Sequence, residues 1–223
     1  HTLFWFCSDN GGLPKIKPET VGGLRGNKGT IYEGGLRVPG IIEWPDRIKQ
    51  SRIVEHPASV LDILPTLLDV LDIEYPIPSR PLDGVSLVPV IDGKATRREK
   101  PIPFRYSGNL ALVDNDYKVL RNKNSKGKFQ LYDLKNDPSE TTDISDQYPN
   151  IAVRLEEHVL HWNDSVEASF AGKDYPEGHV DPSEPEPRFW TDVDEYKPYF
   201  DQWKSRWEYA SRLAPKKKKT QAK

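Results

Sequence analysis

Residues 26–39 read GNKGTIYEGGLRVP, and this stretch carries the most informative pattern in the 223-residue chain. Lys28 stands between Gly26 and Gly29, where the backbone can approach a ligand closely because glycine has no side chain. A lysine in such a loop can present a point positive charge to an anionic group. Taken alone, a loop lysine is usually a solvated surface residue, so the flanking segments decide how this one is interpreted.

The segment before this stretch predicts a strand that ends at a ligand site. Residues 3–7 form an apolar run, typical of a strand buried on both faces of a parallel sheet. Residues 8–12, Ser-Asp-Asn-Gly-Gly, follow at the place where open α/β sheets bind ligands. Asp9 and Asn10 offer two hard oxygen ligands, which suit Ca²⁺ or Mg²⁺ better than Zn²⁺. Two ligands are too few for either ion, and an ordinary Asp-Asn-Gly turn is the alternative.

The segment after it predicts a second apolar strand at 40–44 and then a helix. Asp62 can cap this helix, Pro65 falls in its first turn, and leucines and isoleucines between 63 and 71 repeat at helical spacing. A short helix ends near Gly93. Residues 1–95 are therefore expected to complete one large α/β domain.

A different pattern begins near Pro101. Residues 110–113, 117–120 and 129–134 are strand candidates separated by turn residues. A helix that opens at Pro149 follows, with one apolar face made by Ala152, Leu155, Val159 and Trp162. Residues 96–170 are expected to form a small antiparallel sheet crossed by one helix.

The remaining residues, 171–223, are polar and rich in Pro, Asp and Glu, which indicates a tail that is partly disordered or carries one docked helix. That helix would present Phe200, Trp203, Trp207 and Ala210 on one side as a docking face. The basic run at 216–219 is interpreted as solvated.

Composition excludes several classes of function. The formal net charge is -2, from 32 basic and 34 acidic residues, so no nucleic-acid partner is expected. The single cysteine, Cys7, permits no intrachain disulfide or cysteine zinc site and is interpreted as an inert buried thiol. No stretch approaches the ~20 apolar residues of a membrane span.

Together these segments resemble the sulfatase family, whose arylsulfatase-like members belong to the alkaline-phosphatase superfamily. The resemblance implies the C-terminal part of a large mixed or parallel α/β domain flanked by helices, plus a small antiparallel subdomain. It covers about 2–165 and is carried by 8–12, 26–39, 62–69 (DILPTLLD), 83–87 (DGVSL) and 131–140 (LYDLKNDPSE).

By this resemblance, Asp9 and Asn10 are ligands of a divalent cation, usually Ca²⁺ with Mg²⁺ as the alternative, and Lys28 contacts the sulfate group. A cation and an ammonium group would stabilise the negative charge that grows on a sulfate ester in the transition state. Glu33 and Arg37 are interpreted as a structural ion pair. The implied parent is a sulfuric-ester hydrolase, periplasmic or secreted, that acts on a sulfate ester such as a sulfated glycan.

The family's nucleophile is a formylglycine made from Cys or Ser in a Cys/Ser-x-Pro-x-Arg motif, and this chain has no such motif. The motif is expected upstream, in a missing N-terminal part of the same enzyme, and the chain alone is expected to be inactive. His158 and His161 could share a metal but have no obvious third ligand.

Two alternatives stay open at this point. One is a phosphatase or phosphonate hydrolase of the same superfamily, which the identity of the upstream nucleophile would distinguish. The other is a non-catalytic module that binds sulfated glycans through Lys28 and the aromatic tail, which would have to fold and bind without a partner.

Overall fold

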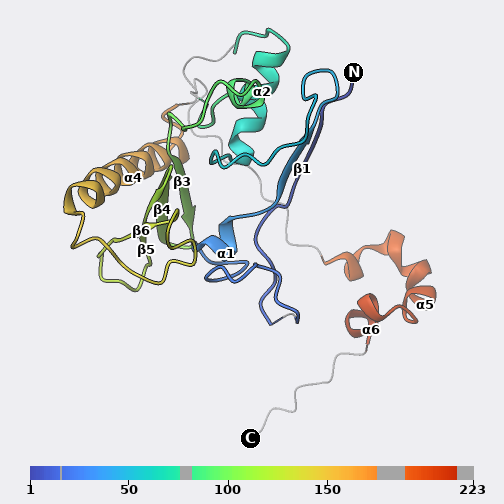
Figure 1. Ribbon diagram of the computed structural model, residues 1–223. Coiled ribbons are helices and arrows are strands. Elements are labelled where there is room, and N and C mark those ends of the chain that lie inside the picture. The colour runs from blue at the N-terminus through green and yellow to red at the C-terminus, as the bar shows by residue number, and fades with distance from the viewer. Residues whose placement is uncertain (16, 76–81, 175–188, 215–223) are drawn as a thin grey trace, which may run out of the picture. The chain divides into compact units, whose positions relative to one another are not determined.

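The computed structural model describes residues 1–15, 17–75, 82–174 and 189–214. The chain divides into two compact units, His1–His179 and Val180–Lys223, and each is described by itself. Figure 1 shows the elements of the first unit, which are β1 (Phe4–Cys7), α1 (Glu33–Leu36), β2 (Gly40–Glu43), the 3-10 helix η1 (Val60–Asp62), α2 (Ile63–Val70), α3 (Val88–Ile91), β3 (Ile102–Tyr106), β4 (Asn109–Asp114), β5 (Tyr117–Arg121), β6 (Gln130–Asp133) and α4 (Pro149–Phe170).

A four-stranded antiparallel sheet in the order β3-β4-β5-β6 forms the centre of this unit. Helix α4 packs on one face, where Leu155 and Val159 are fully buried against residues such as Leu112 and Leu131. The three predicted strands and the predicted helix face are confirmed. Strand β3 was not predicted, because Pro103 weakens the strand pattern, and β3 is an edge strand, where proline is tolerated.

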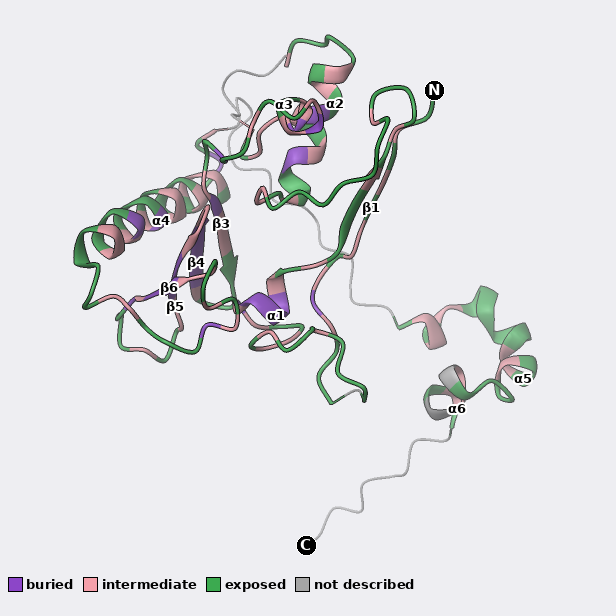
Figure 2. Ribbon diagram, viewed as in Figure 1, coloured by how far each residue is buried: buried purple, intermediate pink, exposed green. Residues whose placement is uncertain are grey.

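The opposite face of this sheet packs against the 26–39 stretch. Ile31 is buried in a cluster with Ala111, Leu120 and Tyr132, and Tyr32 and Leu36 pack beside it. Figure 2 shows α1 buried, although most short segments around it are exposed. The small sheet therefore lies between α4 on one face and the glycine-rich stretch on the other.

Strands β1 and β2 pair with each other antiparallel, in the register Phe4↔Glu43 to Cys7↔Gly40. The prediction that residues 3–7 are buried on both faces is wrong for the described residues: Phe4 is 55% and Phe6 48% exposed. The physical reason is that, among the described residues, β1 belongs to a sheet of two strands, which is too small to bury both of its faces; Figure 2 shows the exposed and intermediate residues along it. Cys7 is accordingly only partly buried.

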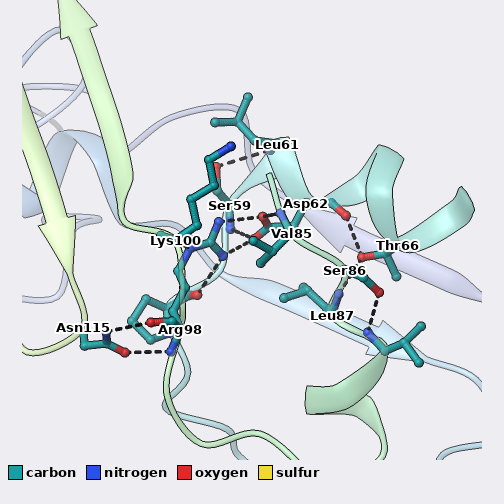
Figure 3. Close-up of polar contacts among 12 residues, drawn as sticks. Ser59, Leu61, Asp62, Thr66, Val85, Ser86, Leu87, Arg98, Lys100 and Asn115 are labelled. Carbon is teal, nitrogen blue, oxygen red and sulfur yellow. Dashed lines mark hydrogen bonds and ion pairs between the residues drawn. The ribbon is translucent and has the colours of Figure 1, made fainter. Parts of the chain in front are cut away.

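Asp62 gives α2 no side-chain cap hydrogen bond, which corrects the predicted cap, although its carboxylate completes a capping box with Ser59 on the preceding helix η1. The buried Asp62 carboxylate accepts two hydrogen bonds from the Arg98 guanidinium, at 2.7 and 2.8 Å. It also accepts the backbone N–H groups of Ser59 (2.7 Å) and Val85 (2.9 Å) (Figure 3). This pair joins α2 to the segment before α3 and to the residues that lead into β3.

The end of β1 contacts α1 backbone to backbone. The Gly11 N–H donates to Gly35 O at 3.0 Å. A β-carbon added to Gly11 would lie 1.9 Å from Gly34 O, so only glycine permits this approach. Gly34 and Gly35 of the Glu-Gly-Gly sequence are also required by close packing, since β-carbons added to them would lie 2.4 Å from Gly26 O and 2.2 Å from Thr30 O.

The second unit contains η2 (Trp190–Asp192), η3 (Asp194–Tyr199), α5 (Phe200–Trp203) and α6 (Trp207–Leu213). Trp203 is at its centre, with the ring centroids of Trp190, Tyr199 and Tyr209 5.5–5.8 Å away. The predicted single stripe is wrong: a break between α5 and α6 interrupts the periodicity, and Trp207 is 88% exposed. Residues 216–219 lie outside the described residues. No described helix is long and apolar enough to cross a membrane.

The surroundings of His56 predict a pH dependence of stability. Burial and then the positive charge of Arg98 lower the pKa of His56 from its ordinary value of 6.5, so unfolding takes up a proton. The contribution of His56 to the unfolding free energy should be complete above about pH 6.5. It should decline as the pH falls from there towards the lower pKa of His56 in the folded state. Chemical denaturation of wild type and His56→Gln at pH 5.5 and 7.5 tests this. The variant should lose the decline, whereas His158→Gln, at an exposed position of α4, should keep it.

The glycine contact at β1 generates a second prediction. Gly11→Ala forces the β1 end away from α1 and should lower the unfolding free energy by about 1–3 kcal/mol, as overpacking does. Gly40→Ala is the matched control, since no atom lies within 4 Å of its added β-carbon. Equal effects of the two substitutions in urea denaturation would contradict the close approach.

Candidate functional site

A cleft of about 410 Å³ opens where β1 ends, and it brings together all three residues predicted for the site. Asp9 and Lys28 are exposed in it and Asn10 is partly buried. Its lining comprises Phe6, Ser8, Asp9, Asn10, Gly11, Gly12, Leu13, Thr20, Val21, Lys28, Arg37, Val38 and Pro39. A carboxylate, an amide and an ammonium group from segments some twenty residues apart thus share one cavity wall.

Backbone hydrogen bonds hold the two segments of the cleft beside each other. The Lys28 N–H donates to Gly12 O at 2.9 Å, directly past the Asp9-Asn10 pair. Within the strand-end turn, the Ser8 hydroxyl donates to Asn10 O at 3.0 Å. Lys28 precedes Gly29, whose φ of +90° allows the sharp turn that leads on to α1. The backbone at Asn10 and Lys28 is therefore fixed by contacts that do not use their side chains.

Arg37 is a cleft residue that sequence reasoning assigned to a structural pair. It is exposed at the end of α1 and lines the cavity with Lys28. Among the described residues, the side chains of Asp9, Lys28 and Arg37 have no hydrogen-bond or ion-pair partner. Two unpaired cations and one unpaired carboxylate around a single cavity are an arrangement that can bind an anion together with a metal cation. The signal available in the sequence was the position of Arg37 in the same motif as Lys28.

Glu33 does not pair with Arg37, which corrects the predicted ion pair. Its carboxylate lies 2.9 Å from the Lys118 ammonium, which also contacts a Glu140 oxygen at 2.8 Å. The Glu33 N–H donates to the other Glu140 oxygen at 2.6 Å. All three side chains are buried, and burial raises the pKa of Glu140 while the Lys118 charge opposes that rise. We call this set the Glu33–Lys118–Glu140 triad.

Sequence reasoning missed the triad because its members are 85 and 107 residues from Glu33 along the chain. One signal was present in the strand pattern. Lys118 is in phase with Leu120, a core residue, and residues two apart in a strand point to the same face. A lysine on the core side of a strand must find a buried carboxylate.

The oxygen donors of the cleft fit part of a divalent-cation site. Asp9 supplies a carboxylate and Asn10 an amide oxygen, which are ligands that Ca²⁺ and Mg²⁺ accept. No group of three or more His, Cys, Asp or Glu side chains in the described part of the chain could hold a metal, and this includes His158 and His161. A cation at Asp9 and Asn10 would need further ligands from beyond these residues.

Comparison with known proteins identifies the family. Residues 26–164 match the family described as N-sulphoglucosamine sulphohydrolase, C-terminal. The chain is 38% identical over 112 residues to the steryl-sulfatase of Mus musculus, a match that covers 47% of this chain and 18% of that protein. It is 27% identical over 183 residues to a sulfatase of Formosa agariphila, covering 73% and 33%. The chain thus spans about a fifth to a third of the length of these relatives.

Solved structures agree with this assignment. The crystal structure of Ps i-CgsB superimposes with a TM-score of 0.63 at 28% identity, covering 72% of this chain and 36% of that one. The match to the family model includes the small sheet and the stretch that carries Lys28, because residues 26–164 contain both. The chain belongs to the family of sulfatase C-terminal regions that is described as N-sulphoglucosamine sulphohydrolase, C-terminal.

Proposed function

We propose that this chain is the C-terminal section of a sulfuric-ester hydrolase, in which it supplies two ligands of a divalent cation and a sulfate-binding lysine. The observation that carries the proposal is the shared cleft, whose lining includes Asp9, Asn10 and Lys28 in a chain of the sulfatase family. A sulfate ester is anionic, and its leaving oxygen gains negative charge in the transition state. The cleft contains the Lys28 ammonium, and a cation bound at Asp9 and Asn10 would join it in stabilising that charge.

Each cleft residue has a distinct part in this proposal. The Lys28 ammonium binds a sulfate oxygen as a point charge, and the Arg37 guanidinium adds a second cation on the same wall. Asp9 and Asn10 hold the cation, with the amide contributing an oxygen but no negative charge. A bound Ca²⁺ or Mg²⁺ would supply Lewis-acid stabilisation of the sulfate. Without it, the Asp9 carboxylate would repel the anionic substrate.

A longer polypeptide is proposed to provide the nucleophile and the remaining cation ligands. The single cysteine of this chain, Cys7, lies in β1 outside any Cys-x-Pro-x-Arg sequence. Large apolar side chains of β1, β2 and α2 remain open to solvent in the first unit, namely Phe4, Phe6, Ile41, Leu64, Leu67 and Leu71. Exposed apolar surface of this kind marks an interface, and we infer that the rest of the enzyme covers it.

The substrate class is proposed to be a sulfated glycan, processed in the periplasm or outside the cell. Support comes from Ps i-CgsB, which has also been crystallised in complex with k-i-k-neocarrahexaose.

Replacing Lys28 tests the sulfate contact. Lys28→Ala should lower kcat/KM for a sulfate ester by about two to four orders of magnitude, as expected on losing one group that stabilises transition-state charge. The assay uses the full sulfatase polypeptide that contains this chain. Lys17→Ala is the control, because Lys17 belongs to the same loop but does not line the cleft. Wild-type turnover by Lys28→Ala would remove Lys28 from the site.

Replacing Asp9 tests the cation site separately. Ca²⁺ that binds only the folded state raises the melting temperature, and the rise grows with the ratio of free ion to Kd. Asp9→Ala should abolish most of this rise in the same polypeptide, and Glu55→Ala, at an exposed position outside the cleft, should retain it. An unchanged Ca²⁺-induced shift in Asp9→Ala would show that the ion binds elsewhere.

A further inference from the structure

We propose that the Glu33–Lys118–Glu140 triad is the positioning element of the cleft, fixing the backbone at Asn10 and Lys28 from the small antiparallel sheet. The catalytic consequence of this inference rests on the proposed function, whereas its structural consequence does not. None of the three residues lines the cleft, so they act through other groups and are positioning residues rather than catalytic ones.

The first step is that the triad holds α1. Glu33 is the first residue of α1, and it is tied twice: its carboxylate to Lys118 (2.9 Å) and its N–H to Glu140 (2.6 Å). Helix α1 has only four residues, too few to be stable through its own hydrogen bonds. Its place in the structure therefore depends on contacts from outside the helix: the triad, the packing of Ile31 against the sheet, and the Gly34 N–H that donates to Arg25 O at 2.7 Å.

The second step is that α1 holds the cleft. Gly35, two residues beyond Glu33, accepts the N–H of Gly11 at 3.0 Å, and Gly11 directly follows Asn10. Gly12 in turn accepts the N–H of Lys28 at 2.9 Å. The backbones of Gly11 and α1 are in close contact, since an added Gly11 β-carbon would lie 1.9 Å from Gly34 O. A shift of α1 would consequently move the backbone at both predicted ligand segments.

The third step concerns why charged residues are used. Buried ion pairs are often no more stabilising than well-packed apolar residues of similar volume, so stability alone does not explain three buried charges. A Lys118 ammonium that contacts two carboxylates, at 2.9 and 2.8 Å, restricts where Glu33 can lie relative to Glu140. Arg25 fixes the Glu140 end further by donating to its backbone carbonyl at 2.7 Å.

The chain contains a matched control for this idea. The Asp62–Arg98 pair is also buried, with side chains 0% and 1% exposed, and has comparable contact distances. It holds the N–H of Val85 (2.9 Å) and not the segments at the cleft. A substitution that weakens the Asp62–Arg98 pair should lower the stability of the first unit without displacing the backbone at Asn10 or Lys28.

Amide hydrogen exchange on the intact chain tests the positioning directly. In Glu140→Gln, the amide must set its NH₂ group against either the Lys118 ammonium or the Glu33 N–H, so one contact becomes donor against donor. The Gly11 and Lys28 amides should then exchange at least about tenfold faster than in wild type. In Asp62→Asn the new NH₂ group replaces the acceptor of either the Val85 or the Ser59 N–H, so one of these two amides should show the acceleration, while Gly11 and Lys28 change by less than about twofold.

The catalytic arm uses the full sulfatase polypeptide at a temperature well below every variant's Tm. Glu140→Gln should lower kcat/KM by about ten- to a hundredfold, because small displacements of positioning groups are costly, and Asp62→Asn should leave it unchanged. Unchanged exchange at Gly11 and Lys28 in Glu140→Gln, or equal acceleration in Asp62→Asn, would overturn the proposal. Wild-type turnover by Lys28→Ala would contradict the proposed function but not the exchange result, so the proposed function can fail while the positioning stands.

A second variant covers the case in which Glu140→Gln does not fold. Lys118→Arg keeps the positive charge but replaces a compact ammonium by a planar fork. It should accelerate exchange at Gly11 and Lys28 while the Val85 amide keeps its protection. Wild-type protection at Gly11 and Lys28 in this variant would overturn the inference.

Discussion

A lysine ammonium shared by two buried carboxylates is the interaction on which the rest of this molecule depends. Lys118 comes from β5, Glu33 from the glycine-rich stretch and Glu140 from the turns after β6. Removing Lys118 would leave two buried carboxylates without a compensating cation, which is far more costly than losing an exposed ion pair. The triad thereby joins three segments that are distant in the chain.

The two faces of the small sheet consequently have different roles. One face forms an ordinary apolar core with α4, through residues such as Leu112 and Leu155. The other combines apolar contacts of Ile31 with the triad and with Arg25, which stacks over the Tyr32 ring at 4.0 Å and donates to Glu140 O. The small sheet is in this way part of the scaffold of the cleft and not merely an appendage to it.

Sequence reasoning recovered what depends on local periodicity and composition. The strands at β4, β5 and β6, the apolar face of α4 and the gathering of Asp9, Asn10 and Lys28 at one cleft were all predictable, because each rests on a short pattern. The roles of those three residues towards a cation and a sulfate stay predictions. What failed depends on long-range pairing.

Three errors show this. Glu33 was paired with a neighbour in its motif, although its partner is on a strand 85 residues away. Asp62 is of a residue type that commonly caps helices, yet its carboxylate pairs with the Arg98 guanidinium, 36 residues further along the chain. The apolar run of β1 was expected to be enclosed, and periodicity cannot tell whether the covering layer belongs to the same segment of chain.

The antiparallel ladder of β1 and β2 has a consequence for handling this region of the protein. A two-stranded ribbon leaves one hydrogen-bonding rim free on each strand, and here the side chains beside those rims include Phe4 and Ile41. Unpaired backbone N–H and C=O groups at a strand edge that is flanked by apolar side chains readily pair with further strands, including the same strand of another copy of the chain. Produced on its own, this region should therefore tend to self-associate through β-addition, and a solubilising change would be best directed at those rims.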